Sequence, residues 1–169
     1  EYRMKKFVSV IFCALLSLFV LVGCGNTPKV AVKDYLNTLK KEGAKYNDSI
    51  TNKLNKEFSS VFKEMDYKIL GVEVNGDYAT VEVEIESKNI SVALTDSMLT
   101  GYMYAYAGFY DDELDTAMEA VMAENLKNQT IEKRRGNIHL INEDGNWEVI
   151  QDSDLEEVIF GACIEGLLY

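Results

Sequence analysis

The sequence predicts an α+β fold in which two antiparallel hairpins pack against helices. Apolar residues recur at helical spacing in three regions, and two other regions alternate between apolar and polar residues. Each alternating region contains an Asn-Gly or Asp-Gly pair, the strongest short-range hairpin signal. The expected order is helix, helix, hairpin, helices, hairpin, helix. Because no internal linker or low-complexity stretch interrupts it, we predict one domain over residues 28–169.

The first two helices are predicted before residue 66. Thr27 suits an N-cap, and Pro28 suits the first helical position. The first helix has its apolar face at Val32, Tyr35, Leu36 and Leu39, with Gly43 as a stop signal. A second helix, capped by Asp48, has its apolar face at Ile50, Leu54, Phe58, Val61, Phe62 and Met65.

Two hairpins are predicted, and a final helix follows the second of them. In the first, Val72 and Val74 precede Asn75-Gly76, and Val81, Val83 and Ile85 then alternate with Glu82, Glu84 and Glu86. This alternation predicts a sheet with one apolar and one acidic, wet face. The second hairpin uses Ile138, Leu140, Trp147 and Val149 around Asp144-Gly145. Residues 152–154 then cap a final helix whose face is Leu155, Val158, Ile159 and Ala162.

Residues 91–128, between the hairpins, are predicted to form two helices, with Asp111 or Asp112 capping the second. The first contains a tyrosine-rich stretch, in which Met98, Tyr102, Tyr106 and Phe109 share one helical face and Tyr104 faces away. We expect this face to be ordinary core, with tyrosine hydroxyls at its rim. Two alternatives remain open: the wall of a pocket for a small, partly apolar ligand, or a contact surface for another envelope protein.

The N-terminal segment has the three-part pattern of a signal peptide. Lys5 and Lys6 precede an apolar run over 7–22, and Leu21-Val22-Gly23-Cys24 resembles the bacterial lipobox. The resemblance implies cleavage after Gly23, a diacylglycerol thioether on Cys24 and a short tether over 24–27. Residues 1–3 then form an upstream extension of the signal peptide 1–23. An uncleaved signal anchor is the alternative.

Charge limits the partners that the chain can bind. The formal net charge is −11, and removal of residues 1–23, which carry a net +2, leaves −13. Such a charge argues against nucleic-acid binding and against electrostatic adhesion to anionic lipid. Attachment to the membrane would therefore depend on acyl chains at Cys24.

Catalytic and metal chemistry find little support in the sequence. His139 is the only histidine, and we expect it on the solvent side of its strand, opposite Ile138 and Leu140. Cys163 lies in an apolar stretch and is expected to be buried, which leaves no thiol device and no internal disulfide. The acidic clusters at 111–115 and 152–157 are interpreted as helix N-termini. We therefore predict a non-enzyme with no metal and no cofactor.

Three stretches together suggest a family. These are the helix that starts at Thr27-Pro28, the hairpin Val74–Val81 and the Gly-Asn-Trp-Glu-Val run at 145–149. They resemble small Gram-positive lipoproteins of unknown function with an NTF2-like or cystatin-like domain. The resemblance implies a curved antiparallel sheet wrapped around helices, often with a cone-shaped pocket. Several members of that superfamily use Asp and His in the pocket. Because His139 is predicted to face outward, no catalytic residue is carried over.

The expected function is a non-catalytic binding or protein-interaction module, lipid-anchored on the extracytoplasmic face of the membrane. Its partners would be the membrane, through Cys24, and an envelope protein. The alternative is a small-molecule carrier or sensor, with a pocket between sheet and helices lined by the 98–109 face. An interaction module should expose an apolar or tyrosine patch, whereas a carrier should enclose a cavity of about 300 Å³ or more. An enzyme should gather titratable groups inside such a cavity.

Overall fold

The computed structural model describes residues 27–42, 52–109 and 112–161, and each structural statement below concerns these residues. The predicted element order and the α+β class are confirmed. The elements are α2 (Pro28–Glu42), α3 (Asn52–Glu64), β1 (Asp66–Asn75), β2 (Tyr78–Lys88), α4 (Ile90–Tyr106), α5 (Asp112–Asn128), β3 (Ile131–Glu143), β4 (Asn146–Val149) and α6 (Ser153–Phe160).

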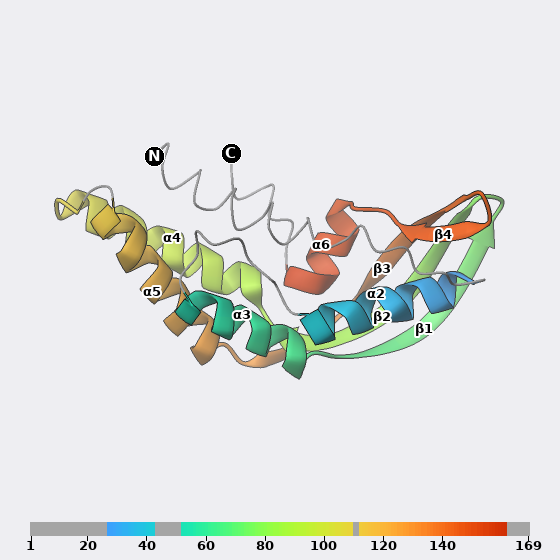
Figure 1. Ribbon diagram of the computed structural model, residues 1–169, viewed down its shortest axis with the longest axis horizontal. Helices are drawn as coiled ribbons and strands as arrows, with labels where there is room; N and C mark the ends of the chain where they lie inside the picture. Colours follow the sequence, from blue (N-terminus) through green and yellow to red (C-terminus); the bar gives the residue numbers. More distant parts are fainter. Residues whose placement is uncertain (1–26, 43–51, 110–111, 162–169) are drawn as a thin grey trace.

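The sheet has four antiparallel strands in the order β1-β2-β3-β4. Figure 1 shows it curving around α2 and α6, with α2 beginning at the end of the molecule that carries both hairpin turns. Helices α4 and α5 form a helical hairpin, and the turn between them lies at the opposite end of the long axis. The molecule therefore has a sheet half, formed by the four strands with α2, α3 and α6, and a helical half, formed by α4 and α5.

The hairpin turns follow the predicted chemistry. Gly76 opens the first turn with a φ of 62°. At the second turn Asp144 and Gly145 both have positive φ, 52° and 84°, as a type I′ turn requires. A β-bulge in β1 shifts the register between Ile69 and Gly71. Because one extra residue reverses the parity, Ile69 and Val72 both face the same side of the sheet.

The main core lies between the concave face of the sheet and the helices. It contains Val32, Leu36 and Leu39 from α2, Phe58, Val61 and Phe62 from α3, Val81, Val83 and Ile85 from β2, Ile138 and Leu140 from β3, and Leu155, Val158 and Phe160 from α6. The rings of Phe62 and Phe160 meet edge to face, with centroids 6.4 Å apart. The predicted apolar faces of α3, β2 and α6 are thus buried where they fall within the described residues, whereas Val72 and Val74 of β1 are 44% and 54% exposed.

The opposite face of the sheet is acidic and wet, as predicted, and its acids are partly ion-paired. Lys133 lies 2.8 Å from Glu86, and Lys68 and Arg135 lie within 3.9 Å of Glu84. The two glutamates raise the pKa of Lys133. These pairs cross from one strand to the next, so they favour the observed register.

Arg134 fixes the C-terminal end of α6 to the sheet. Its guanidinium donates to the carbonyl oxygens of Val158 and Ile159, at 3.2 and 3.1 Å, and to the Ser87 hydroxyl. The last carbonyls of a helix have no partner within the helix, and a cation there satisfies them. Burial lowers the pKa of Arg134. The final helix is therefore held to β3 by a buried charge.

Candidate functional site

Helix α4 buries one narrow face against the rest of the protein. Asn89 caps its first turn, since the side-chain oxygen accepts from the Val92 amide at 3.0 Å. The buried residues follow helical spacing and are mostly small: Ile90, Ser91, Ala93, Leu94, Ser97 and Gly101. A face built from small residues lets a neighbouring helix approach closely.

The partner across this face is α5. A β-carbon added at Gly101 would lie 2.8 Å from the Met118 sulfur, so the absence of a side chain makes room for Met118. The buried Ser97 hydroxyl donates to the Ala93 carbonyl at 2.6 Å and accepts from the Asn125 amide at 3.1 Å. The two helices are thus joined by close packing and by a satisfied polar network.

The outward face of α4 carries large apolar side chains. Leu99 is 65% exposed, Met103 67% and Tyr106 97%. Met103 and Tyr106 follow Leu99 by four and seven residues, and these spacings keep the three side chains on one side of the helix. We call the exposed set the α4 stripe: Val92, Leu99, Tyr102, Met103 and Tyr106. Contiguous exposed apolar surface of this kind marks interaction sites in soluble proteins.

The expectation that the tyrosine-rich face is core is wrong. Of the predicted residues, only Met98 packs against the main core. Tyr102 and Phe109 are exposed, at 44% and 40%, as is Tyr106. Tyr104, which was expected to face away, instead packs against Leu114 and Met118. The reason is steric: α5 comes close only where α4 has small residues, and Tyr104 continues that face.

The space beneath the stripe is filled. Leu114 and Met118 of α5 form a small separate core with Tyr104 and Ala105. The Tyr104 ring also contacts the ring of Phe109, with centroids 5.4 Å apart. This packing of Tyr104 and Ala105 against α5 favours a filled interface over the alternative of a carrier pocket lined by the 98–109 face.

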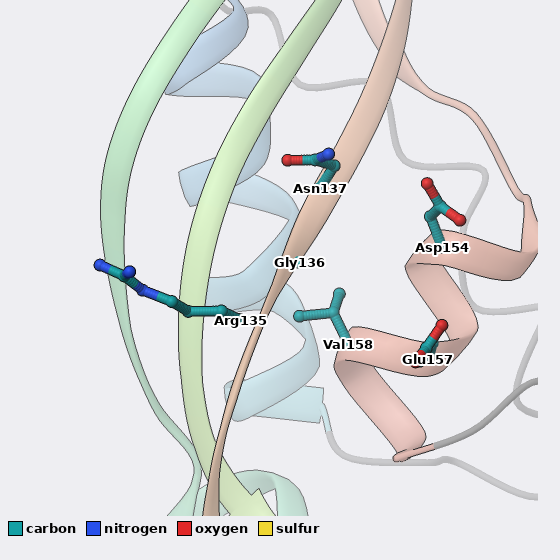
Figure 2. A pocket seen from close by; sticks show the side chains of 6 residues that line it. All are labelled: Arg135, Gly136, Asn137, Asp154, Glu157 and Val158. Atoms are coloured by element: carbon teal, nitrogen blue, oxygen red, sulfur yellow. The ribbon is translucent and has the colours of Figure 1, made fainter.

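A small pocket lies elsewhere, between the edge of β3 and α6. Figure 2 shows Asp154, Glu157 and Val158 on the helix side, facing the strand at Arg135, Gly136 and Asn137. Its volume is about 180 Å³, below the usual range for ligand sites. Val158 approaches Gly136 closely: a β-carbon added at Gly136 would lie only 3.0 Å from the Val158 β-carbon. The pocket is thus a shallow gap beside a tight helix–strand contact.

His139 lies beside two carboxylates. Its Nδ1 hydrogen-bonds to Asp152 Oδ2 at 2.7 Å, and its Nε2 lies 3.8 Å from Asp154. Ile138 and Leu140 are buried and His139 points to the other side, as predicted, although its ring is two-thirds buried. Asp152 also accepts from the Leu155 amide at 2.9 Å, so it caps α6 as expected. His139 is not among the residues that line the pocket, and the cluster ties α6 to β3.

Several predicted features lie outside the described residues. These are the signal-peptidase motif Leu21, Val22 and Gly23, the lipidation site Cys24, and Cys163. In the described part of the chain, no three or more His, Cys, Asp or Glu residues are grouped to hold a metal ion. No helix in that part is long and apolar enough to cross a membrane.

Sequence reasoning missed three residues that matter here: Leu99, Met103 and Arg134. Leu99 and Met103 could have been found by assigning the small residues Ala93, Ser97 and Gly101 to the buried face. For Arg134 the signal is its even spacing from Ile138 and Leu140. Because side chains alternate along a strand, this spacing places Arg134 on the core face of β3.

The sequence matches no family model and no curated protein. A structure similar to this chain is that of ycdA from Bacillus subtilis, a protein assigned as a lipoprotein. The two share 14% sequence identity with a TM-score of 0.45, over 91% of this chain and 56% of ycdA. This chain therefore spans little more than half of ycdA, and a likeness this weak identifies neither a fold family nor a function.

Proposed function

We propose that the protein is a lipid-anchored extracytoplasmic lipoprotein whose α4–α5 hairpin binds a protein partner without catalysing a reaction. The α4 stripe is the observation that carries the proposal. A row of large apolar side chains in water is unfavourable unless a partner covers it, and each one transferred from water gains about 1.5–3 kcal/mol when fully buried. A filled core beneath the stripe favours a partner that lies on it over a ligand that enters it.

The chemistry of the partner follows from the charges around the stripe. Among the described residues of 90–128, the exposed charged side chains are Lys127 against Asp96, Asp112, Glu113 and Glu124. A matching surface has an apolar centre flanked by Lys or Arg. A helix with one apolar stripe and basic borders meets both conditions, because it lies along a neighbouring helix with its cations near these carboxylates.

The placement of the hairpin suits a tethered protein. Pro28 begins α2 only four residues after Cys24, at the end of the molecule with the sheet turns. The turn between α4 and α5 lies at the other end. An anchor on Cys24 would hold the sheet end near the bilayer and direct the helical hairpin toward partners farther from it.

Binding can be tested with a fluorescein-labelled amphipathic helical peptide of leucine and lysine. The wild-type protein should bind it, and the double variant Leu99→Ser/Met103→Ser should bind about tenfold more weakly or worse, because two apolar contacts are lost. The matched control, Val30→Ser/Ile131→Ser, removes exposed apolar residues that lie outside the stripe and should bind like wild type. Equal binding by both variants would contradict the proposal. Mass spectrometry that finds a discrete small molecule copurifying with the protein would favour the carrier.

The anchor has its own test. Replacing Cys24→Ser should release the protein from the membrane fraction, because the acidic surface offers no attraction to anionic lipid. Continued membrane association of this variant would mean that acylation is not what holds the protein there.

A further inference from the structure

A second surface lies on the sheet half, at the edge of β1. Because β1 is the terminal strand of the sheet, one row of its backbone N–H and C=O groups is not paired within the sheet. Such an edge is a template for another strand. Past the bulge, the segment Gly71–Asn75 is open, and Val72 and Val74 are 44% and 54% exposed.

The two sides of this segment differ in chemistry. Val72 and Val74 pair with the buried residues Val81 and Ala79, so they lie on the core side, at a corner that the helices do not cover. Glu73 lies on the acidic side. Glu82 reaches the same edge, since a β-carbon at Gly71 would lie 3.7 Å from its carboxylate oxygen.

The carboxylates beside the β1 edge favour one kind of partner strand. Nearer the start of β1, Lys68 supplies a cation for Glu84, whereas no described ion pair reaches Glu73 or Glu82. A second copy is disfavoured, because antiparallel pairing of two β1 strands would bring the acidic side of one against that of the other. A strand with Lys or Arg on the acidic side and apolar residues on the core side complements both faces.

We propose that Gly71–Asn75 accepts an extended segment of a partner protein by strand addition, and that this segment alternates apolar with basic residues. Main-chain hydrogen bonds provide affinity. Val72 and Val74 contact the apolar side chains of the segment, and Glu73 and Glu82 contact its basic side chains. This inference is independent of the α4 stripe, which lies on a different element.

The test uses two fluorescein-labelled octapeptides, one alternating lysine with valine and the other glutamate with valine. Wild-type protein should bind the lysine peptide preferentially, and binding should slow amide hydrogen exchange within Gly71–Asn75. Glu73→Lys should weaken lysine-peptide binding about tenfold, since an attraction is lost and a repulsion gained, and it should strengthen glutamate-peptide binding. Val74→Lys should also weaken binding, because it places a charge on the apolar side.

Ile131→Ser is the matched control, because Ile131 is 55% exposed and lies outside both proposed surfaces, and it should bind both peptides like wild type. All three substituted residues are exposed, so the variants should fold, which circular dichroism checks. Equal binding of both peptides, no binding by folded wild type, or protection that maps to α4 would each overturn the proposal. So would self-association that Val74→Lys abolishes, because the occupant would then be a second copy.

Discussion

The sheet half and helix α4 use large apolar side chains in opposite ways. In the sheet half, Phe58, Phe62 and Phe160 are fully buried between strands and helices. On α4 the buried face consists mainly of small residues, and Leu99 and Met103 face outward. The difference teaches that close helix packing, and not side-chain hydrophobicity alone, decides which face of a helix is inside.

The largest effect should come from truncating the main core. Phe62→Ala should lower the free energy of unfolding by about 3–5 kcal/mol, because it removes buried contacts and leaves a cavity. Urea denaturation followed by circular dichroism measures this loss. A loss below about 1 kcal/mol would mean that the sheet half does not hold the main core.

A smaller effect is expected at the clamp on α6. Arg134→Gln should cost about 2 kcal/mol, because it leaves the carbonyls of Val158 and Ile159 without their charged donor. The matched control Arg135→Gln affects only an exposed ion pair with Glu84 and should cost about 0–1 kcal/mol. The same urea titration compares them, and equal costs would contradict the role of Arg134.

Tyr35 gives the sheet half a dependence on alkaline pH. Burial raises the pKa of its hydroxyl above the ordinary value of 10.0, despite a hydrogen bond from Gln151 that acts the other way. The unfolded state therefore loses this proton first, so stability should be intact below pH 10.0 and fall as the pH rises above it. Burial also raises the pKa of Tyr67, which acts in the same direction.

The variant Tyr35→Phe should flatten this fall. The free energy of unfolding, measured by urea titration at neutral pH and again above pH 10, should change less with pH in the variant than in wild type. An unchanged slope would show that Tyr35 is not buried as described.

The smallest effect should come from the α4 stripe. Leu99→Ser and Met103→Ser should each change the free energy of unfolding by no more than about 0.5 kcal/mol, because both side chains are already largely exposed. Thermal unfolding of each variant beside Phe62→Ala tests the contrast. A loss near 2 kcal/mol for either serine variant would place the stripe in the core and erase the difference between the two halves.

Most of the fold could be predicted from the sequence, because local signals agreed with tertiary packing. Asp144-Gly145 specified its turn, alternation around Val81 and Val83 specified the faces of β2, and Thr27 marked a helix start. The bulge after Ile69 was not predictable, since it depends on the partner strand. The buried side of Arg134 also depends on α6, whose residues Val158 and Ile159 lie 24 and 25 positions farther along the sequence.

The candidate site was located in the right segment, although its inner and outer faces were misjudged. Periodicity placed Met98, Tyr102 and Tyr106 together, but it does not reveal which side a neighbouring helix covers. That choice depends on the fit between Gly101 and Met118. Whether Cys24 is lipidated and whether the domain is NTF2-like or cystatin-like stay predictions.

Methionine oxidation by dilute hydrogen peroxide, read by mass spectrometry, tests the exposed α4 stripe most directly. Met103 is 67% exposed, while Met118 and Met122 are 1% and 0% exposed. In the purified protein Met103 should be oxidised well before Met118 and Met122, and in intact cells a bound partner should slow its oxidation. Oxidation of Met103 as slow as that of Met118 in the purified protein would contradict the account, because the stripe would then be buried by the protein itself.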